Sequence, residues 1–128
     1  MKILLDTHAF IWMDTDPSKI SSRVLQHLNN TNNVVYLSVA SVWEMVIKTQ
    51  TGKLVLSDSI EKIVSEQMKR NPLHLLPIEF NHVLAVQTLP NFHKDPFDRL
   101  LVAQAKTENA ILLSTDPIIR QYPVQVEW

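Results

Sequence analysis

The chain has 128 residues, enough for one domain with its own core, and 45% of them are hydrophobic while 20% are charged. It contains no cysteine, which excludes a disulfide scaffold, a thiolate metal site and a cysteine nucleophile. Its single glycine excludes the glycine-rich phosphate loops, and its net charge of −1 argues against binding nucleic acid mainly through overall positive charge.

Short apolar runs alternate along the chain with segments of helical periodicity. Apolar, β-branched runs are typical of buried strands, while apolar residues recurring every three to four positions are typical of helices. In chain order, the sequence predicts a strand at 3–5, a helix at about 17–28, a strand at 34–37, helices at about 41–49 and 59–68, a strand at 73–78, helices at 81–89 and 96–107, a strand at 110–113, a helical turn at 117–121 and an edge strand at 124–126.

Three helix boundaries rest on particular residues. Asp16 and Pro17 form a cap followed by proline in the first turn, and Gly52 ends the helix over 41–49 or its connection. Asp58 and Glu61 have the spacing of a capping box, which predicts the start of the next helix.

The alternation of strands and helices predicts an α/β fold. Parallel strands need crossover connections, so we expect a single domain over residues 1–128, with a parallel sheet and helices on both faces. The opening MKILLD carries an apolar run too short for a signal peptide, and no stretch of about 18 apolar residues follows. We therefore expect a cytoplasmic protein without a membrane span.

Four acidic residues fall where a parallel sheet binds ligands, beyond the carboxyl ends of its strands. Asp6 directly follows the first strand, and Asp116 follows the strand over 110–113. Glu44 and Asp98 lie in the opening turns of helices, where the positive end of the helix dipole favours an anion. All four carboxylates can therefore meet at one edge of the sheet.

Carboxylates gathered in this way repel one another and take up protons unless a cation compensates them. Mg²⁺ or Mn²⁺ fits best, because both ions prefer oxygen ligands and retain several waters. Water on such an ion is acidified and becomes a nucleophile, while the ion stabilises the phosphoryl oxygens in the transition state. The chemistry predicted is the hydrolysis of phosphodiester bonds.

Each carboxylate also has a purely structural explanation. Asp6 fits a turn cap after its strand, and Asp116 fits an ordinary helix N-cap. Asp98 fits a first-turn residue favoured by the helix dipole, and Glu44 fits an ion pair with Lys48 one turn later. Their convergence on one edge favours the shared site over four separate structural roles.

Two cations adjoin these acids in sequence. Lys48 and Arg99 are candidates for binding substrate phosphate, and the alternative for each is a salt bridge to a nearby carboxylate. His93 lies in a polar loop and is assigned no role.

Four blocks of the sequence together resemble PIN-domain nucleases, specifically the toxin component of VapBC-type toxin–antitoxin pairs. The blocks are LLDTHAFIW, SVWEMVIKTQTGKL, HKDPFDRLLVAQA and LLSTD, and the resemblance covers nearly the whole chain. It implies an α/β/α sandwich with a central, mostly parallel sheet and the activity of a Mg²⁺- or Mn²⁺-dependent endoribonuclease that arrests growth. It also implies a homodimer that a small antitoxin neutralises. The protein would contact DNA only through that antitoxin.

The resemblance further implies roles for individual residues. Asp6 and Asp98 would be the main metal ligands, with Glu44 completing the site directly or through water. Asp116 would act through a second metal or a water. Thr7 and Thr115 would orient these ligands by hydrogen bonds.

Two other classes compete with the nuclease. A receiver-like signalling domain has similar length and an acidic Mg²⁺ pocket, but it needs an adjacent acidic pair after its first strand, where this chain has Asp6 followed by Thr7. A degenerate PIN module that only binds partners is the other class, and the retention of all four acids argues against it.

Overall fold

Five short strands form one sheet in which every neighbouring pair is parallel. The computed structural model describes residues 1–128, and its strand order is β3–β2–β1–β4–β5. The strands are β1 (Lys2–Leu5), β2 (Val34–Ser38), β3 (Leu73–Leu76), β4 (Ile111–Leu113) and β5 (Val126–Glu127). Leu5 of β1 pairs with Leu37 of β2 and with Leu113 of β4. The carboxyl ends of the three central strands therefore lie level with one another.

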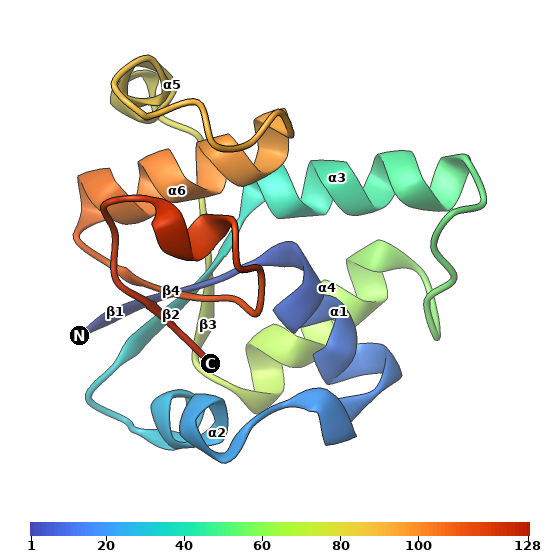
Figure 1. Ribbon diagram of the computed structural model, residues 1–128. Coiled ribbons are helices and arrows are strands. Elements are labelled where there is room, and N and C mark those ends of the chain that lie inside the picture. The colour runs from blue at the N-terminus through green and yellow to red at the C-terminus, as the bar shows by residue number, and fades with distance from the viewer.

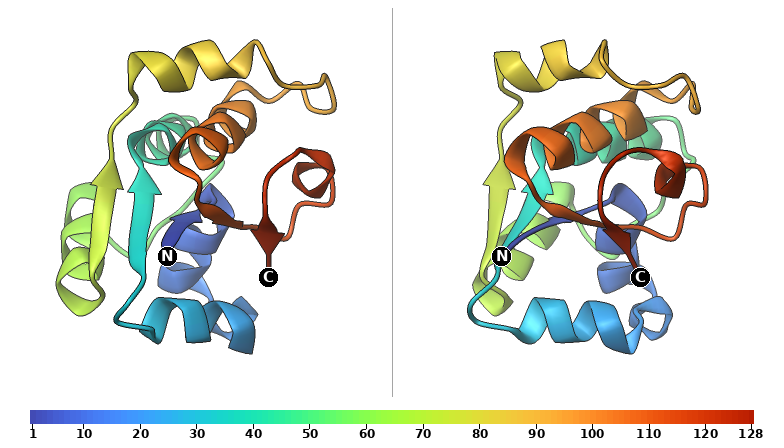
Figure 2. Two further views of the ribbon diagram at one scale, coloured as in Figure 1. Left: turned by 90° about the vertical axis from the view of Figure 1, so that its left-hand side faces the viewer. Right: turned by 60° about the vertical axis from the view of Figure 1, so that its left-hand side comes forward.

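Helices cover both faces of this sheet, which confirms the predicted α/β/α sandwich. They are α1 (Thr7–Thr15), α2 (Ser22–Asn29), α3 (Val39–Gln50), α4 (Ile60–Arg70), α5 (Phe80–Val86) and α6 (Pro96–Glu108), with 3-10 helices η1 (Pro17–Lys19) and η2 (Ile119–Gln121). Helices α1, α2 and α4 lie on one face and α6 on the other, with α5 outside α6 (Figures 1 and 2). Helix α3 leaves the end of β2 and runs beside α6.

The central strand supplies both hydrophobic cores. Successive side chains of a strand point to opposite faces, so Ile3 and Leu5 enter the core beneath α1, α2 and α4. Leu4 enters the core beneath α6. All three are fully buried, which explains why this strand is an unbroken apolar run.

A chain of buried polar side chains fixes α6 against the rest of the fold. The Ser38 hydroxyl donates to Oε1 of Gln104 at 2.6 Å, and Nε2 of Gln104 lies 3.3 Å from Nδ1 of His82. Nε2 of His82 then lies 2.8 Å from Oε2 of Glu108. Since Ser38, Gln104 and His82 are fully buried, these hydrogen bonds replace those lost to water.

One observed helix was not predicted from the sequence, and one predicted helix is divided in two. The first helix after β1 is α1, which the sequence did not reveal because several adjacent residues are buried and no polar face interrupts them. The helix expected over 17–28 is divided into η1 and α2. The side chain of Ser21 accepts a hydrogen bond from the N–H of Val24 and starts α2 there.

The predicted cap of α4 was wrong, whereas the predicted end of α3 is confirmed. Ser59, rather than Asp58, accepts from the N–H of Lys62, while the Asp58 carboxylate pairs with the Lys62 ammonium at 3.0 Å. Gly52 follows α3 with a φ of 75°, in the left-handed region that glycine adopts without a steric penalty.

None of the helices is both long and apolar enough to cross a lipid bilayer.

Candidate functional site

Asp6 occupies the turn between β1 and α1. Its backbone N–H donates to the carbonyl of Leu113 at 3.1 Å, and this bond joins the ends of β1 and β4. Its carboxylate accepts from the N–H of Ala9 at 2.7 Å and caps α1. The Asp6 side chain is therefore both a helix cap, as its structural explanation requires, and a buried carboxylate at the sheet edge.

Asp98 and Asp116 approach this position from α6 and from the segment after β4. Asp95 accepts hydrogen bonds from the N–H groups of Phe97 and Asp98, which leaves the Asp98 carboxylate free of a capping role. Asp116 accepts from the N–H of Ile118 at 2.8 Å, so one of its oxygens caps the turn that follows.

Three of the four predicted carboxylates line one cavity of about 280 Å³. Its lining consists of Asp6, His8, Trp12, Asp98, Thr115, Asp116 and Ile119. Two of the three carboxylates follow neighbouring strands, and the third begins a helix that packs on the same sheet. The predicted convergence at the carboxyl edge is therefore present for these three.

Glu44 is held on the neighbouring side by two fixed partners. Its Oε1 accepts the Thr7 hydroxyl at 2.7 Å, and its Oε2 lies 2.8 Å from the ammonium of Lys48. The Ser41 hydroxyl lies 2.9 Å from that of Thr7 and extends this buried cluster. Glu44 lines a second pocket, which also contains Asp95 and the start of α6.

The protonation of Asp98 reflects this crowding. Burial, followed by the negative charges of Asp95, Glu44 and Asp116, raises the pKa of Asp98 to about 7, against the opposing effect of His93. A carboxyl group with this pKa is partly protonated near neutral pH.

Asp6 is affected in the same direction for a similar reason. Burial raises the pKa of the Asp6 carboxyl, while hydrogen bonds from the Ser114 hydroxyl and the Ala9 N–H act against that rise. Two members of the cluster therefore bear an electrostatic cost in their charged form, which a bound cation would relieve.

Thr115 was expected to orient a carboxylate by hydrogen bonding, but its neighbour Ser114 makes these hydrogen bonds. Ser114 is fully buried, hydrogen-bonds the Asp6 side chain and accepts the N–H of Asp116 at 3.1 Å. Thr115 is exposed and lines the cavity without a hydrogen bond to a carboxylate. A role for Ser114 was not predicted from the sequence, because both faces of β4 are buried and alternation along the strand does not single out Ser114.

Arg99 points away from the acidic cluster. Its guanidinium donates to the carbonyls of Pro90 at 2.7 Å and Val86 at 3.2 Å, and to the Tyr122 hydroxyl at 3.3 Å. These contacts tie the segment after α5 to α6, and they give Arg99 a structural role that differs from the expected alternative, a salt bridge to a carboxylate.

His93, which was assigned no role from the sequence, contacts two of the carboxylates. Its Nε2 lies 3.0 Å from Oδ2 of Asp98 and 3.2 Å from Oδ2 of Asp116. One atom from each of the three side chains lies within 4.8 Å of the other two, an arrangement compatible with a metal ion.

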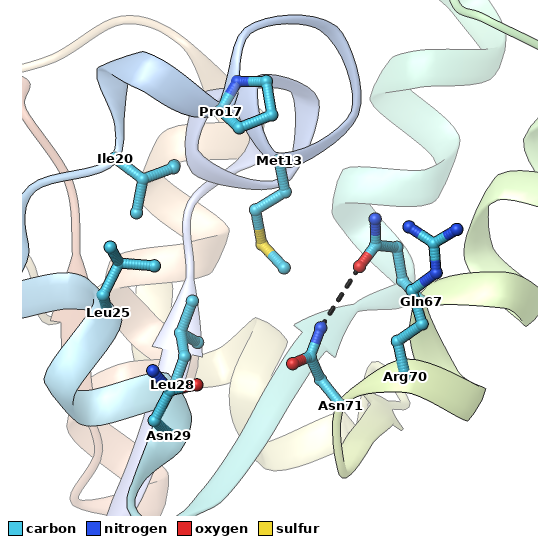
Figure 3. A pocket seen from close by; sticks show the side chains of 9 residues that line it. All are labelled: Met13, Pro17, Ile20, Leu25, Leu28, Asn29, Gln67, Arg70 and Asn71. Carbon is cyan, nitrogen blue, oxygen red and sulfur yellow. Dashed lines mark hydrogen bonds between the residues drawn. The ribbon is translucent and has the colours of Figure 1, made fainter.

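The pocket drawn in Figure 3 lies elsewhere, between α1, η1, α2 and α4. Its lining consists of Met13, Pro17, Ile20, Leu25, Leu28, Asn29, Gln67, Arg70 and Asn71. It contains neither a carboxylate nor a histidine, in contrast to the cavity at the sheet edge.

The donor set at that edge fits a hard divalent cation. Asp6, Asp98 and Asp116 present carboxylate oxygens to one cavity, and the pKa values of Asp6 and Asp98 are raised as expected for acids that lack compensating charge. Fold and site together define an α/β domain with an acidic edge at the carboxyl ends of its central strands.

The chain belongs to the PIN-domain family, whose members are generally nucleases. The model of that family, described as PIN domain, matches residues 3–125. No curated protein matches the chain in sequence.

Solved structures with the same fold include toxin–antitoxin complexes. The chain is similar to VapBC2 from Rickettsia felis bound to a promoter DNA fragment, with a TM-score of 0.74, 17% identity, and coverage of 99% of this chain and 98% of the other. It is similar to DNA-bound VapBC from Salmonella typhimurium, with a TM-score of 0.68, 14% identity and coverage of 99% and 97%. It is also similar to FitAcB from Neisseria gonorrhoeae, with a TM-score of 0.59, 20% identity, and coverage of 98% of this chain and 96% of the other.

Proposed function

We propose that this protein is a Mg²⁺- or Mn²⁺-dependent endoribonuclease that acts in the cytoplasm as a growth-arresting toxin. The observation that supports this most directly is the meeting of Asp6, Asp98 and Asp116 around one cavity at the carboxyl edge of the sheet. In a member of the PIN-domain family, a cavity of this kind suits the cleavage of a phosphodiester backbone.

In this proposal, Asp6 and Asp98 hold the cation, Asp116 contributes from the segment after β4, and Glu44 completes the site directly or through water. When bound, the ion supplies an acidified water as nucleophile and compensates charge on the phosphate oxygens. Ser114 holds the Asp6 carboxylate in place.

Glu44 has its orientation set before any ion arrives. Thr7 and Lys48 each engage one of its oxygens, so the side chain cannot rotate freely. Lys48 also lies beside the second pocket, where its ammonium can reach a substrate phosphate as well as Glu44.

The toxin role rests on the fold shared with VapBC and FitAB complexes. We propose that a small antitoxin from the same system neutralises this protein, that the free toxin is a homodimer, and that contact with DNA occurs only through the antitoxin. Alignment over nearly the full length of each neighbour supports this assignment.

The nuclease is tested with purified protein freed of any antitoxin. We expect it to cleave RNA with Mg²⁺ or Mn²⁺ and to be inactive in EDTA. Asp6→Asn and Asp98→Asn should each abolish cleavage while circular dichroism stays unchanged, because the lost charge serves the cation. Full activity in both variants contradicts the proposal.

The toxin role is tested separately in cells. Induced expression of the wild type should arrest growth, whereas Asp98→Asn should not, and co-expression of the small antitoxin proposed above should restore growth. A wild-type protein with nuclease activity in vitro and no effect on growth would remove the toxin role and leave the enzyme.

A further inference from the structure

His93 lies between two acids of the site without belonging to a helix or strand. It precedes α6, and its Nε2 lies 3.0 Å from Asp98 and 3.2 Å from Asp116. Asp98 is carried by α6, and Asp116 follows β4. A single ring nitrogen therefore bridges two carboxylates that reach the site from different elements.

The backbone determines which nitrogen carries the proton. The N–H of Asp95 lies 3.2 Å from Nδ1 of His93 and points to it. A backbone N–H can only donate, so Nδ1 must accept, and the proton of the neutral ring belongs on Nε2. Nε2–H is then the donor to the two carboxylates.

The imidazole is not among the side chains that line the cavity. Asp98 and Asp116 both line the cavity of about 280 Å³, whereas His93 does not. Its side chain is 14% exposed. The cavity is therefore bounded by the two carboxylates and not by the ring that contacts them.

We propose that His93 is a positioning residue that holds Asp98 and Asp116 together for cation binding, by donating its Nε2–H to both. This inference rests on the proposed function, since it concerns the same cation site. The Asp95 N–H that fixes the tautomer comes from the residue that caps α6, so the helix start and the orientation of the carboxylates are set by one short segment.

Direct ligation through Nε2 is the competing role, and the geometry opposes it. A ligating Nε2 carries no proton, so the proton would move to Nδ1 and face the N–H of Asp95. Two donors would then oppose each other over 3.2 Å, and the loop would have to shift.

The test measures Mn²⁺ binding to the purified, metal-free protein by calorimetry, independently of RNA cleavage. His93→Ala removes the donor and should weaken binding about tenfold to a hundredfold. His93→Gln places an amide N–H near the position of Nε2, and should bind within about threefold of the wild type. His74→Ala is the matched control, since His74 is exposed on β3 and touches no carboxylate of the site.

The two variants separate positioning from ligation. Equal binding by His93→Ala and the wild type overturns the proposal, and so does a loss in His93→Gln as large as that in His93→Ala, which is expected of a ligand. A wild type that binds no Mn²⁺ contradicts the metal dependence in the proposed function instead.

A second measurement needs no metal. Nitrogen-15 NMR of the metal-free protein, at a pH where the ring is neutral, should show Nδ1 of His93 unprotonated and Nε2 protonated, and this pattern supports the proposal whatever the affinity for Mn²⁺. A proton on Nδ1 of the neutral ring overturns it.

Discussion

Thr7, the first residue of α1, donates its hydroxyl to Oε1 of Glu44 on α3 at 2.7 Å. The bond joins the turn that carries Asp6 to the helix that carries Glu44. Both residues are buried, and Glu44 is 4% exposed. The orientation of one carboxylate is therefore coupled to the chain segment of another.

Replacing Thr7 tests this coupling. Thr7→Val keeps the shape of the side chain but leaves Glu44 and Ser41 without their shared partner. We expect the free energy of unfolding to fall by about 1–2 kcal/mol and the rate of RNA cleavage to fall about tenfold. Thr7→Ser retains the hydroxyl and is the control. Equal urea-unfolding midpoints and cleavage rates for Thr7→Val and the wild type would contradict the coupling.

The raised pKa of Asp98 makes stability depend on pH. Because the folded state holds this proton more tightly than the unfolded state, the contribution of Asp98 to stability is lost as pH rises from about 4 to about 7. Asp98→Asn removes the titration. In EDTA, we expect the variant to gain stability relative to the wild type over this interval, by on the order of 2–4 kcal/mol.

Urea unfolding at about pH 4 and about pH 7 measures this difference. Added Mn²⁺ should reverse it at the higher pH by stabilising the wild type and not the variant. A constant difference between the two proteins across the interval would show that Asp98 titrates normally.

Lys48 is predicted to stabilise the protein through Glu44. Lys48→Met leaves a buried carboxylate with Thr7 as its remaining partner, so we expect a loss of about 1–3 kcal/mol in metal-free protein. Adding Glu44→Gln should recover much of the loss, because no unpaired charge remains. If Lys48 served substrate alone, Lys48→Met would raise KM and leave stability unchanged.

Arg99 is predicted to affect stability and not catalysis. Arg99→Gln loses most of the hydrogen bonds to Pro90, Val86 and Tyr122, at a cost of about 1–2 kcal/mol. The folded variant should keep the kcat and KM of the wild type. Lys69→Gln, at an exposed cation near the end of α4, is the control and should change neither. A raised KM in Arg99→Gln would instead indicate that Arg99 contacts the substrate.

The meeting of the carboxylates was predictable because it follows from strand ends. Asp6 adjoins β1 and Asp116 lies three residues beyond β4, and parallel strands bring such residues to one edge. Asp98 was predictable for a related reason, since it lies in the first turn of α6, a helix whose apolar face the sequence shows.

The remaining errors concern interactions that depend on tertiary structure. Nothing local distinguishes His93 from any histidine in a polar loop, because its partner Asp116 is brought to it only by the fold. Arg99 adjoins an acid in sequence, yet its side chain leaves the helix on a different side. Ser59 and Asp58 are both good caps, and the choice between them depends on where the incoming chain meets α4.

The buried hydrogen bonds of Gln104 fix the position of α6 along its own axis. Apolar packing tolerates small sliding of a helix, but Gln104 can meet Ser38 and His82 together in only one setting. Asp98 lies six residues earlier on the same rigid rod, about 9 Å along its axis. A substitution of Gln104 would therefore displace the Asp98 carboxylate near the start of α6, although Gln104 itself does not line the cavity.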